Sequence, residues 1–219
     1  MSSVAVTTDR YPQVAPLFHE AGLDPVWLPC IQVEPAEPEV LEEARMLAEG
    51  ADLLVVSSVR TVDILWPNGP IADVEVAAVG ESTAAAAAAR GGRVVVTGRA
   101  GLRDLVDQLA DRLTGAAFPH AAGTNPLTLE MLADAGVHLV EVYRTTPIAP
   151  GPTSVDAVVF ASPSAVEGWL LTRSLEGLVV GVIGSTTRAA LAAPPDVVAA
   201  RPTYRALAEA MAKHLGVAA

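Results

Sequence analysis

Two short motifs, each present twice, carry the residues best suited to chemistry in this chain. One is a serine that precedes a stretch of helical length, and the other is a glycine followed three residues later by a threonine. The residues are Ser58, Gly80 and Thr83 in one copy and Ser162, Gly184 and Thr187 in the other. Hydroxyl groups and free backbone N–H groups at the start of a helix favour anions, so the motifs predict an anion-binding site.

Each motif also has a simpler explanation. Ser and Thr are common helix N-caps, and Gly makes tight turns, so one motif alone would indicate capping. Four such motifs in two related halves favour a ligand site, because open α/β sheets bind ligands at the carboxyl ends of their strands. The six alanines after Thr83 have a separate reason, since a helix of small residues can pack closely on its sheet.

The elements that must position these residues follow an alternating pattern. Short Val/Ile/Ala runs alternate with Ala/Leu/Glu-rich segments, which is typical of parallel strands joined by crossover helices. The pattern predicts strands near residues 3–7, 25–33, 52–56, 74–79, 93–97, 115–119, 137–146, 155–160, 178–183 and 196–200. It predicts helices near 11–21, 38–49, 59–66, 81–90, 101–113, 125–135, 163–172, 185–193 and 203–215. The predicted class is therefore α/β.

The motifs belong to a longer internal repeat. VVSSVRTVDIL (55–65) aligns with VFASPSAVEGW (159–169), and the serine and glycine pairs have one offset, since 162 − 58 and 184 − 80 both give 104. LRDLVDQL and YRALAEAM, which begin at residues 102 and 204, align at an offset of 102. LFHEAGLDPVWLP and MLADAGVHLVEVY, which begin at residues 17 and 131, form a third pair in the opposite chain order.

This permuted repeat predicts two similar parallel-sheet lobes, flavodoxin- or Rossmann-like, with one inserted in the other. Residues 1–31 and 150–219 would form one discontinuous lobe, and residues 37–142 the inserted lobe. Residues 30–36 and 142–149 would join the lobes as a two-stranded β-ladder hinge, because two extended segments that lie together pair.

Composition and charge exclude several function classes. The chain has 25 acidic and 14 basic residues, with no basic run that could follow a phosphate backbone, so nucleic acid is not expected as a partner. Its apolar runs are far shorter than a membrane span, and we expect no secretory signal. A single cysteine excludes an internal disulfide. We expect a cytoplasmic monomer with no membrane partner.

The motifs of common cofactors and nucleophiles are absent from the sequence. There is no G-x-G-x-x-G, no Walker loop and no G-x-S-x-G elbow. The histidines are too scattered for a metal site and are expected at the surface or at helix caps: His19, His120, His138 and His214. The tryptophans are expected in the core: Trp27, Trp66 and Trp169. No metal and no cofactor are expected.

Six stretches together resemble the uroporphyrinogen-III synthase family, and the resemblance covers essentially the whole chain. They are VVSSVRTVD, VAAVGESTAAAA, LVEVYRTTP, VVFASPSAVEGW, GVIGSTTRAAL and YRALAEAM. No single stretch is specific for the family, but their order, their spacing and the VYRTTP crossing together are specific for it. The resemblance implies a cofactor-free lyase that converts the linear tetrapyrrole hydroxymethylbilane, with loss of water and inversion of ring D through a spiro intermediate, into uroporphyrinogen III.

The resemblance also implies roles for particular residues. Tyr143 matches a tyrosine of the family's site and is the candidate acid for the departing hydroxyl, although it could instead only pack at the hinge. The expected substrate-binding residues are Thr7, Arg10, Ser58, Gly80, Thr83, Ser162, Gly184 and Thr187. Because the substrate bears eight carboxylates, arginines are expected to reinforce this set: Arg10, Arg60, Arg144 and Arg188.

The sequence departs from the family in one place. Where relatives often have an arginine, FPHAAGTNPLTLEML carries His120, Thr124 and Asn125. Family-like proteins also occur as domains attached to regulators, so the alternative is a catalytically weak module that binds tetrapyrroles or regulates another activity.

Overall fold

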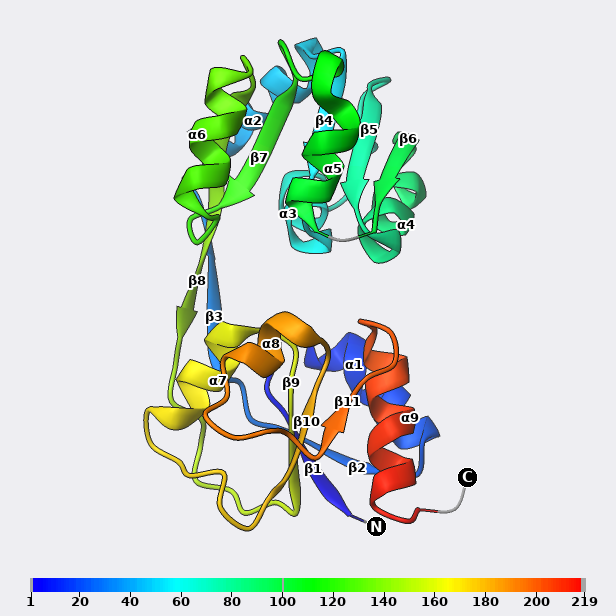
Figure 1. The fold of residues 1–219 in the computed structure, drawn as a ribbon, viewed down its shortest axis with the longest axis vertical. Coiled ribbons are helices and arrows are strands. Elements are labelled where there is room, and N and C mark those ends of the chain that lie inside the picture. Colours follow the sequence, from blue (N-terminus) through cyan, green and yellow to red (C-terminus); the bar gives the residue numbers. More distant parts are fainter. Residues whose placement is uncertain (1, 100, 218–219) are drawn as a thin grey trace. The chain divides into compact units, whose positions relative to one another are not determined.

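The computed structural model describes residues 2–99 and 101–217. The described chain separates into two compact units (Figure 1). Unit 1 contains the residues up to Val33 together with those from Thr145 onward, and unit 2 contains Glu34–Arg144. Each unit has its own sheet and its own core.

Unit 1 is built on a five-stranded parallel sheet in the order β11-β10-β9-β1-β2. The strands are β1 (Ser3–Val6), β2 (Asp24–Trp27), β9 (Ala157–Phe160), β10 (Val179–Val182) and β11 (Val197–Val198). The helices are α1 (Tyr11–Glu20), α7 (Pro163–Leu170), α8 (Ser185–Ala189) and α9 (Tyr204–His214). The three central strands are almost wholly buried, as expected for a sheet with helices on both faces.

The alternation of side chains along β1 divides the core of unit 1 into two layers. Val4 and Val6 pack with Phe18 of α1 and Leu207 of α9. Ala5 packs on the opposite side with residues of α7, including Trp169. The period-two pattern of a strand therefore places α1 and α9 on one face and α7 on the other.

The second sheet has six strands in the order β3-β8-β7-β4-β5-β6 and belongs to unit 2, except that part of β3 and part of β8 belong to unit 1. Its strands are β3 (Ile31–Pro35), β4 (Leu53–Val56), β5 (Glu75–Val79), β6 (Arg93–Gly98), β7 (Ala117–Ala121) and β8 (His138–Pro147). Its helices are α2 (Pro38–Gly50), α3 (Val59–Leu65), α4 (Glu81–Ala89), α5 (Leu102–Leu109), the short 3₁₀ helix Ala110–Arg112 and α6 (Pro126–Asp134). Leu105 of α5 and Leu132 of α6 share a core layer with Leu53 and Phe118 of the sheet.

The pairing of β3 with β8 is an exception to the parallel pattern, whereas β8 pairs parallel with β7. The Ala36 N–H donates to the Val142 carbonyl at 2.9 Å, and the Ile148 N–H donates to the Cys30 carbonyl at 2.9 Å. Since the partner number falls as the residue number rises, the two strands run antiparallel.

The predicted class is confirmed, and the element boundaries differ in a few places. The single strand predicted at 25–33 is two strands, β2 and β3, separated by Leu28–Cys30. Pro29 interrupts the pairing because it has no N–H group, while the N–H groups of Leu28 and Cys30 donate to the carbonyls of Val6 and Thr7. The helix predicted at 185–193 is wrong in its second half, since α8 ends at Ala189.

Gly168 allows α7 to pack against backbone. A methyl group at this position would lie far inside van der Waals contact with the Cys30 carbonyl oxygen and 2.7 Å from the Ile148 carbonyl oxygen. These two carbonyls belong to residues that are hydrogen-bonded to each other. The helix therefore lies directly on the two extended segments, which no larger residue permits.

Candidate functional site

In unit 1, the predicted site residues gather at the carboxyl edge of the sheet. Thr7 directly follows β1, Ser162 follows β9 and Gly184 follows β10. The register pairs Val6 with Val159 and Val182 with Phe160, so the three strands end at the same level. Arg10 precedes α1 at this edge, as its N-cap residue.

Several hydroxyl groups in unit 1 have structural partners. The Ser162 Oγ accepts a hydrogen bond from the Ala165 N–H at 3.2 Å and caps α7. The Thr7 hydroxyl donates to the Val159 carbonyl at 2.7 Å, and only 2% of the residue is exposed. Capping and strand pairing therefore account for part of this motif, and substrate binding by these residues stays a prediction.

Unit 2 repeats the arrangement. Ser58 follows β4 and Gly80 follows β5, and the register pairs Val56 with Ala78. The Ser58 Oγ accepts from the Arg60 N–H at 3.1 Å, as an N-cap of α3. Thr83 and its counterpart Thr187 are both the third residue of their helices, and each is 3% exposed.

The two glycines of the repeat differ in backbone conformation. Gly80 has φ 90° and ψ 160°, a region open almost exclusively to glycine, whereas Gly184 is extended at φ −179°. A methyl group would meet no atom within 4 Å at either position. Replacing either glycine by alanine would therefore cause no steric clash, and only the change at Gly80 would strain the backbone.

We expect Gly80→Ala to lower the free energy of unfolding by about 1–3 kcal/mol, because alanine is strained at that φ. Gly184→Ala is the matched control and should change it by less than about 0.5 kcal/mol, since alanine adopts extended backbone freely. Urea unfolding of both variants measures the difference. Equal losses would contradict the assigned conformations.

Tyr143 lies on β8 at the level where β7 ends, opposite Ala121 in the register. The residue is 6% exposed, and the Arg60 guanidinium carbon lies 6.0 Å from the centre of its ring. Within residues 2–99 and 101–217 its hydroxyl makes no hydrogen bond, whereas the Tyr11 hydroxyl donates to the Pro25 carbonyl at 2.7 Å. The Tyr143 hydroxyl oxygen is not fully buried, so solvent or a ligand can reach it.

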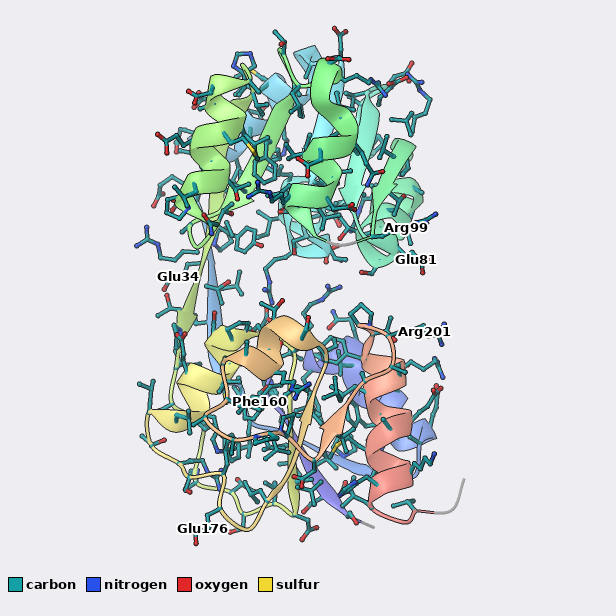
Figure 2. All side chains as sticks on the ribbon, viewed as in Figure 1. Glu34, Glu81, Arg99, Phe160, Glu176 and Arg201 are labelled. Carbon is teal, nitrogen blue, oxygen red and sulfur yellow. The ribbon has the colours of Figure 1, made fainter. Side chains whose placement is uncertain are left out.

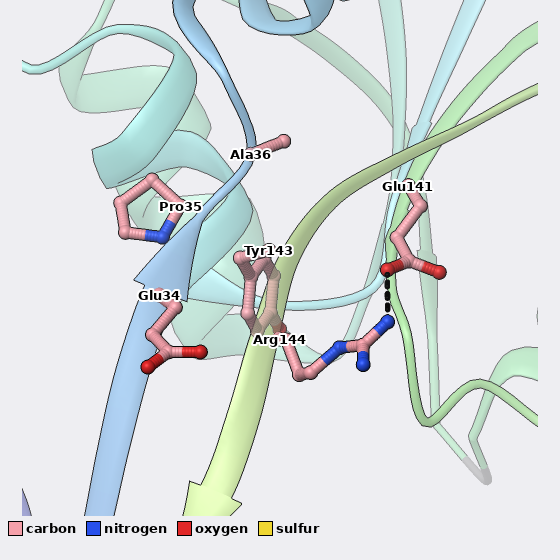
Figure 3. A pocket seen from close by; sticks show the side chains of 6 residues that line it. All are labelled: Glu34, Pro35, Ala36, Glu141, Tyr143 and Arg144. Carbon is pink, nitrogen blue, oxygen red and sulfur yellow. Dashed lines mark hydrogen bonds and ion pairs between the residues drawn. The ribbon is translucent and has the colours of Figure 1, made fainter.

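A pocket of about 230 Å³ opens beside Tyr143 (Figure 3). Its lining residues are Glu34, Pro35, Ala36, Glu141, Tyr143 and Arg144. The Arg144 guanidinium pairs with the Glu141 carboxylate at 3.3 Å, and 65% of the arginine side chain is exposed. An exposed pair of this kind contributes little to stability, so Arg144 can exchange Glu141 for another carboxylate at small cost.

His120, Thr124 and Asn125, which stand where the resemblance predicts an arginine, lie at the end of β7 and in the turn that leads to α6. His120 is buried, stacks on Phe118 with ring centres 5.6 Å apart, and places its Nδ1 3.0 Å from the Ala121 carbonyl oxygen. The expectation of a surface or capping position is wrong for this histidine, because β7 is a central strand. Thr124 donates to the Ala121 carbonyl at 2.8 Å, and Asn125 caps α6 by accepting from the Leu127 N–H at 2.9 Å. Thr124 and Asn125 thus shape the turn, and His120 packs in the core at the end of β7.

Trp27 corrects a second expectation. Trp66 and Trp169 are buried as predicted, but Trp27 is 52% exposed. It ends β2 opposite Val6, so it lies at the same carboxyl edge as Thr7, and it stacks on Tyr11 with ring centres 5.8 Å apart. The Trp27 Nε1–H donates to the Thr8 carbonyl at 3.0 Å, which fixes the indole in its exposed position. Its place on an edge strand explains why it is not covered.

Cys30 is unsuited to nucleophilic chemistry. Burial raises the pKa of its thiol to about 12, although the charge of Arg173 acts in the opposite direction. The thiol is therefore protonated at neutral pH, and the thiolate is the reactive form.

Across 2–99 and 101–217, no three His, Cys, Asp or Glu side chains come together as metal ligands. The same ranges include no helix with the length and apolar character that crossing a membrane requires.

Comparison with known proteins identifies the family. The model of the uroporphyrinogen-III synthase HemD family matches residues 12–209. A comparison with curated proteins gave no match. Among solved structures, a mutant uroporphyrinogen III synthase from Thermus thermophilus is 21% identical, with a TM-score of 0.63 over 99% of both chains. The uroporphyrinogen-III synthetase from Helicobacter pylori is 16% identical, with a TM-score of 0.66 over 98% of this chain and 99% of that one.

These structures show that the fold is shared, and the family model covers most of the sequence, including both repeat motifs and Tyr143. The chain belongs to the uroporphyrinogen-III synthase family.

Proposed function

We propose that this protein is a uroporphyrinogen-III synthase, which closes hydroxymethylbilane to uroporphyrinogen III with inversion of ring D and loss of water. The observation that carries this proposal is the family match over residues 12–209. The solved structures with this fold include uroporphyrinogen III synthases from two organisms, which supports the same activity here.

The proposed binding surface is the carboxyl edge of each sheet. Its residues are Thr7, Arg10, Ser162, Gly184 and Thr187 in unit 1 and Ser58, Gly80 and Thr83 in unit 2. Backbone N–H groups of the turns and first helical turns, together with nearby arginines, would bind the eight carboxylates of the substrate. Donors fixed by the backbone would allow a protein of net charge −11 to hold a polyanion.

Tyr143 is the proposed acid. Its hydroxyl would donate a proton to the hydroxyl group of the substrate, which leaves as water and generates an electrophilic carbon on ring A. Ring D attacks this carbon through its substituted position, and the spiro intermediate then rearranges and loses a proton to restore the aromatic pyrrole. That proton balances the one given by Tyr143, so the net products are uroporphyrinogen III and water. Orienting ring D for this attack is the main task of the protein.

The finer architecture is also a proposal. We propose that residues 1–31 with 150–219 and residues 37–142 act as two lobes, and that residues 30–36 and 142–149 act as hinge strands. The chain passes from one compact unit to the other inside β3 and again inside β8, at Val33–Glu34 and Arg144–Thr145, which supports this assignment. We further propose a cytoplasmic monomer, with no nucleic-acid or membrane partner.

The activity is tested by adding the purified protein to freshly generated hydroxymethylbilane after dialysis against EDTA. We expect the bilane to disappear much faster than in protein-free buffer, with no effect of EDTA, because no cofactor is proposed. A rate equal to that of buffer would contradict the proposed function. Activity lost on chelation and restored by one metal would contradict the cofactor-free mechanism.

A further inference from the structure

Two exposed arginines occupy equivalent positions in the two halves of the repeat. Arg99 lies in GRAGLRDL, which begins at residue 98, and Arg201 lies in ARPTYRAL, which begins at residue 200. The offset, 201 − 99, is 102, the value that aligns the helical segments beginning at residues 102 and 204. The same position of the sequence repeat is therefore an arginine in both copies.

Both arginines follow the strand that neighbours a glycine–threonine motif. The register pairs Gly98 of β6 with Val79 of β5, so Arg99 lies beside Gly80 at the carboxyl edge of unit 2. In unit 1, Val198 of β11 pairs with Val182 of β10, and Arg201 follows on the side of Gly184. Both residues are exposed, and both are labelled in Figure 2.

Most arginines elsewhere in the chain are paired with carboxylates. The paired ones are Arg45, Arg90, Arg93, Arg112, Arg144 and Arg205. Neither Arg99 nor Arg201 takes part in an ion pair with any residue that the structure describes, although acidic residues outnumber basic ones by 25 to 14. Both guanidinium groups are thus available to an external carboxylate.

The backbone of each arginine is fixed while its charged group stays exposed. The Arg99 N–H donates to the Asp104 Oδ2 at 3.0 Å. The Arg201 carbonyl accepts from the Thr203 N–H at 2.7 Å, in a turn where the Thr203 Oγ1 accepts from the Ala206 N–H at 3.2 Å. Different contacts therefore hold the backbone of the two arginines, and both side chains stay exposed.

We propose that Arg99 and Arg201 each bind a carboxylate of the tetrapyrrole substrate, as a repeat-related pair with one member in each unit. The inference rests on the proposed function, since it assigns two carboxylate-binding residues to the same reaction. Arginine suits the role because its planar guanidinium can donate two parallel hydrogen bonds to one carboxylate. Lysine would keep the charge and lose this geometry.

The test compares Arg99→Gln and Arg201→Gln with two controls of identical charge change, Arg93→Gln and Arg205→Gln. The control arginines are also exposed, but they pair with Glu75 and Glu20. We expect KM for hydroxymethylbilane to rise about tenfold in Arg99→Gln and in Arg201→Gln, with kcat within about twofold, as for loss of a substrate carboxylate contact. The controls should keep KM within about twofold of wild type.

Two further measurements separate binding from structure. The melting temperatures of Arg99→Gln and Arg201→Gln should stay within about 2 °C of wild type, and lysine at either position should restore part of the lost affinity. An active wild-type enzyme whose Arg99 and Arg201 variants match the controls in KM would overturn the inference and leave the proposed function intact. A wild-type protein that does not convert the bilane would instead overturn the proposed function.

Discussion

Gly168→Ala is expected to destabilise unit 1 by about 3 kcal/mol or more, or to prevent it from folding. The added methyl group cannot avoid the Cys30 and Ile148 carbonyl oxygens unless α7 moves away from both segments. Both oxygens are backbone atoms, so no side-chain rotation relieves the clash. A loss of this size corresponds to a fall of about 6–12 °C in melting temperature. Differential scanning calorimetry measures it.

Gly50→Ala is the control for this substitution. Gly50 is the last residue of α2, and a methyl group there would meet no atom within 4 Å. We expect no loss of stability, and a gain of up to about 1 kcal/mol from the higher helix propensity of alanine. If Gly168→Ala melted like wild type, the close approach of α7 to the backbone would be wrong.

Tyr143→Phe is expected to lower the rate of formation of uroporphyrinogen III by about tenfold or more. The substitution keeps the ring under the Arg60 guanidinium and removes the hydroxyl, which has no hydrogen-bond partner among the described residues. The melting temperature should therefore stay nearly unchanged. General acid catalysis can contribute about 10²–10⁴-fold, but the substrate hydroxyl leaves readily, so the lower part of this range is expected. Single-turnover kinetics measures the chemical step.

Tyr11→Phe is the matched control, because it also removes one phenol hydroxyl. That hydroxyl donates to the Pro25 carbonyl, so its loss should reduce stability by about 1 kcal/mol and leave the rate unchanged. If Tyr143→Phe equalled wild type in rate, Tyr143 would only pack at its strand, and catalysis would depend on substrate positioning alone.

The order and type of the elements could be predicted from the sequence because they depend on local patterns. Apolar runs and helical segments alternate clearly along the chain. Parallel pairing alone then places the motifs that follow the strands at the carboxyl edge of each sheet. The break between β2 and β3 does not follow from the apolar pattern, because Val26, Trp27 and Leu28 form one apolar run, although Pro29 is the local signal for the interruption.

The roles of individual polar groups depend on neighbours that are distant in sequence. The Thr7 hydroxyl donates to the Val159 carbonyl, and Trp27 is exposed because β2 is an edge strand. Neither contact nor exposure can be predicted from the local sequence. Gly80 and Gly184 align in sequence but differ in φ, because alignment constrains position and not conformation. The equivalence of Arg99 and Arg201, in contrast, can be predicted from the sequence, because the repeat offset of 102 residues relates them.

The identity of the product isomer tests the central claim most directly. Hydroxymethylbilane closes without an enzyme to the type I isomer, in which ring D is not inverted, so inversion is the event that requires the protein. The reaction is stopped by oxidation, and the type I and type III uroporphyrins are separated by chromatography at increasing protein concentration. The account predicts that type III rises to nearly all of the product while type I disappears. Fast closure to type I, or an isomer ratio that does not depend on protein concentration, would contradict it.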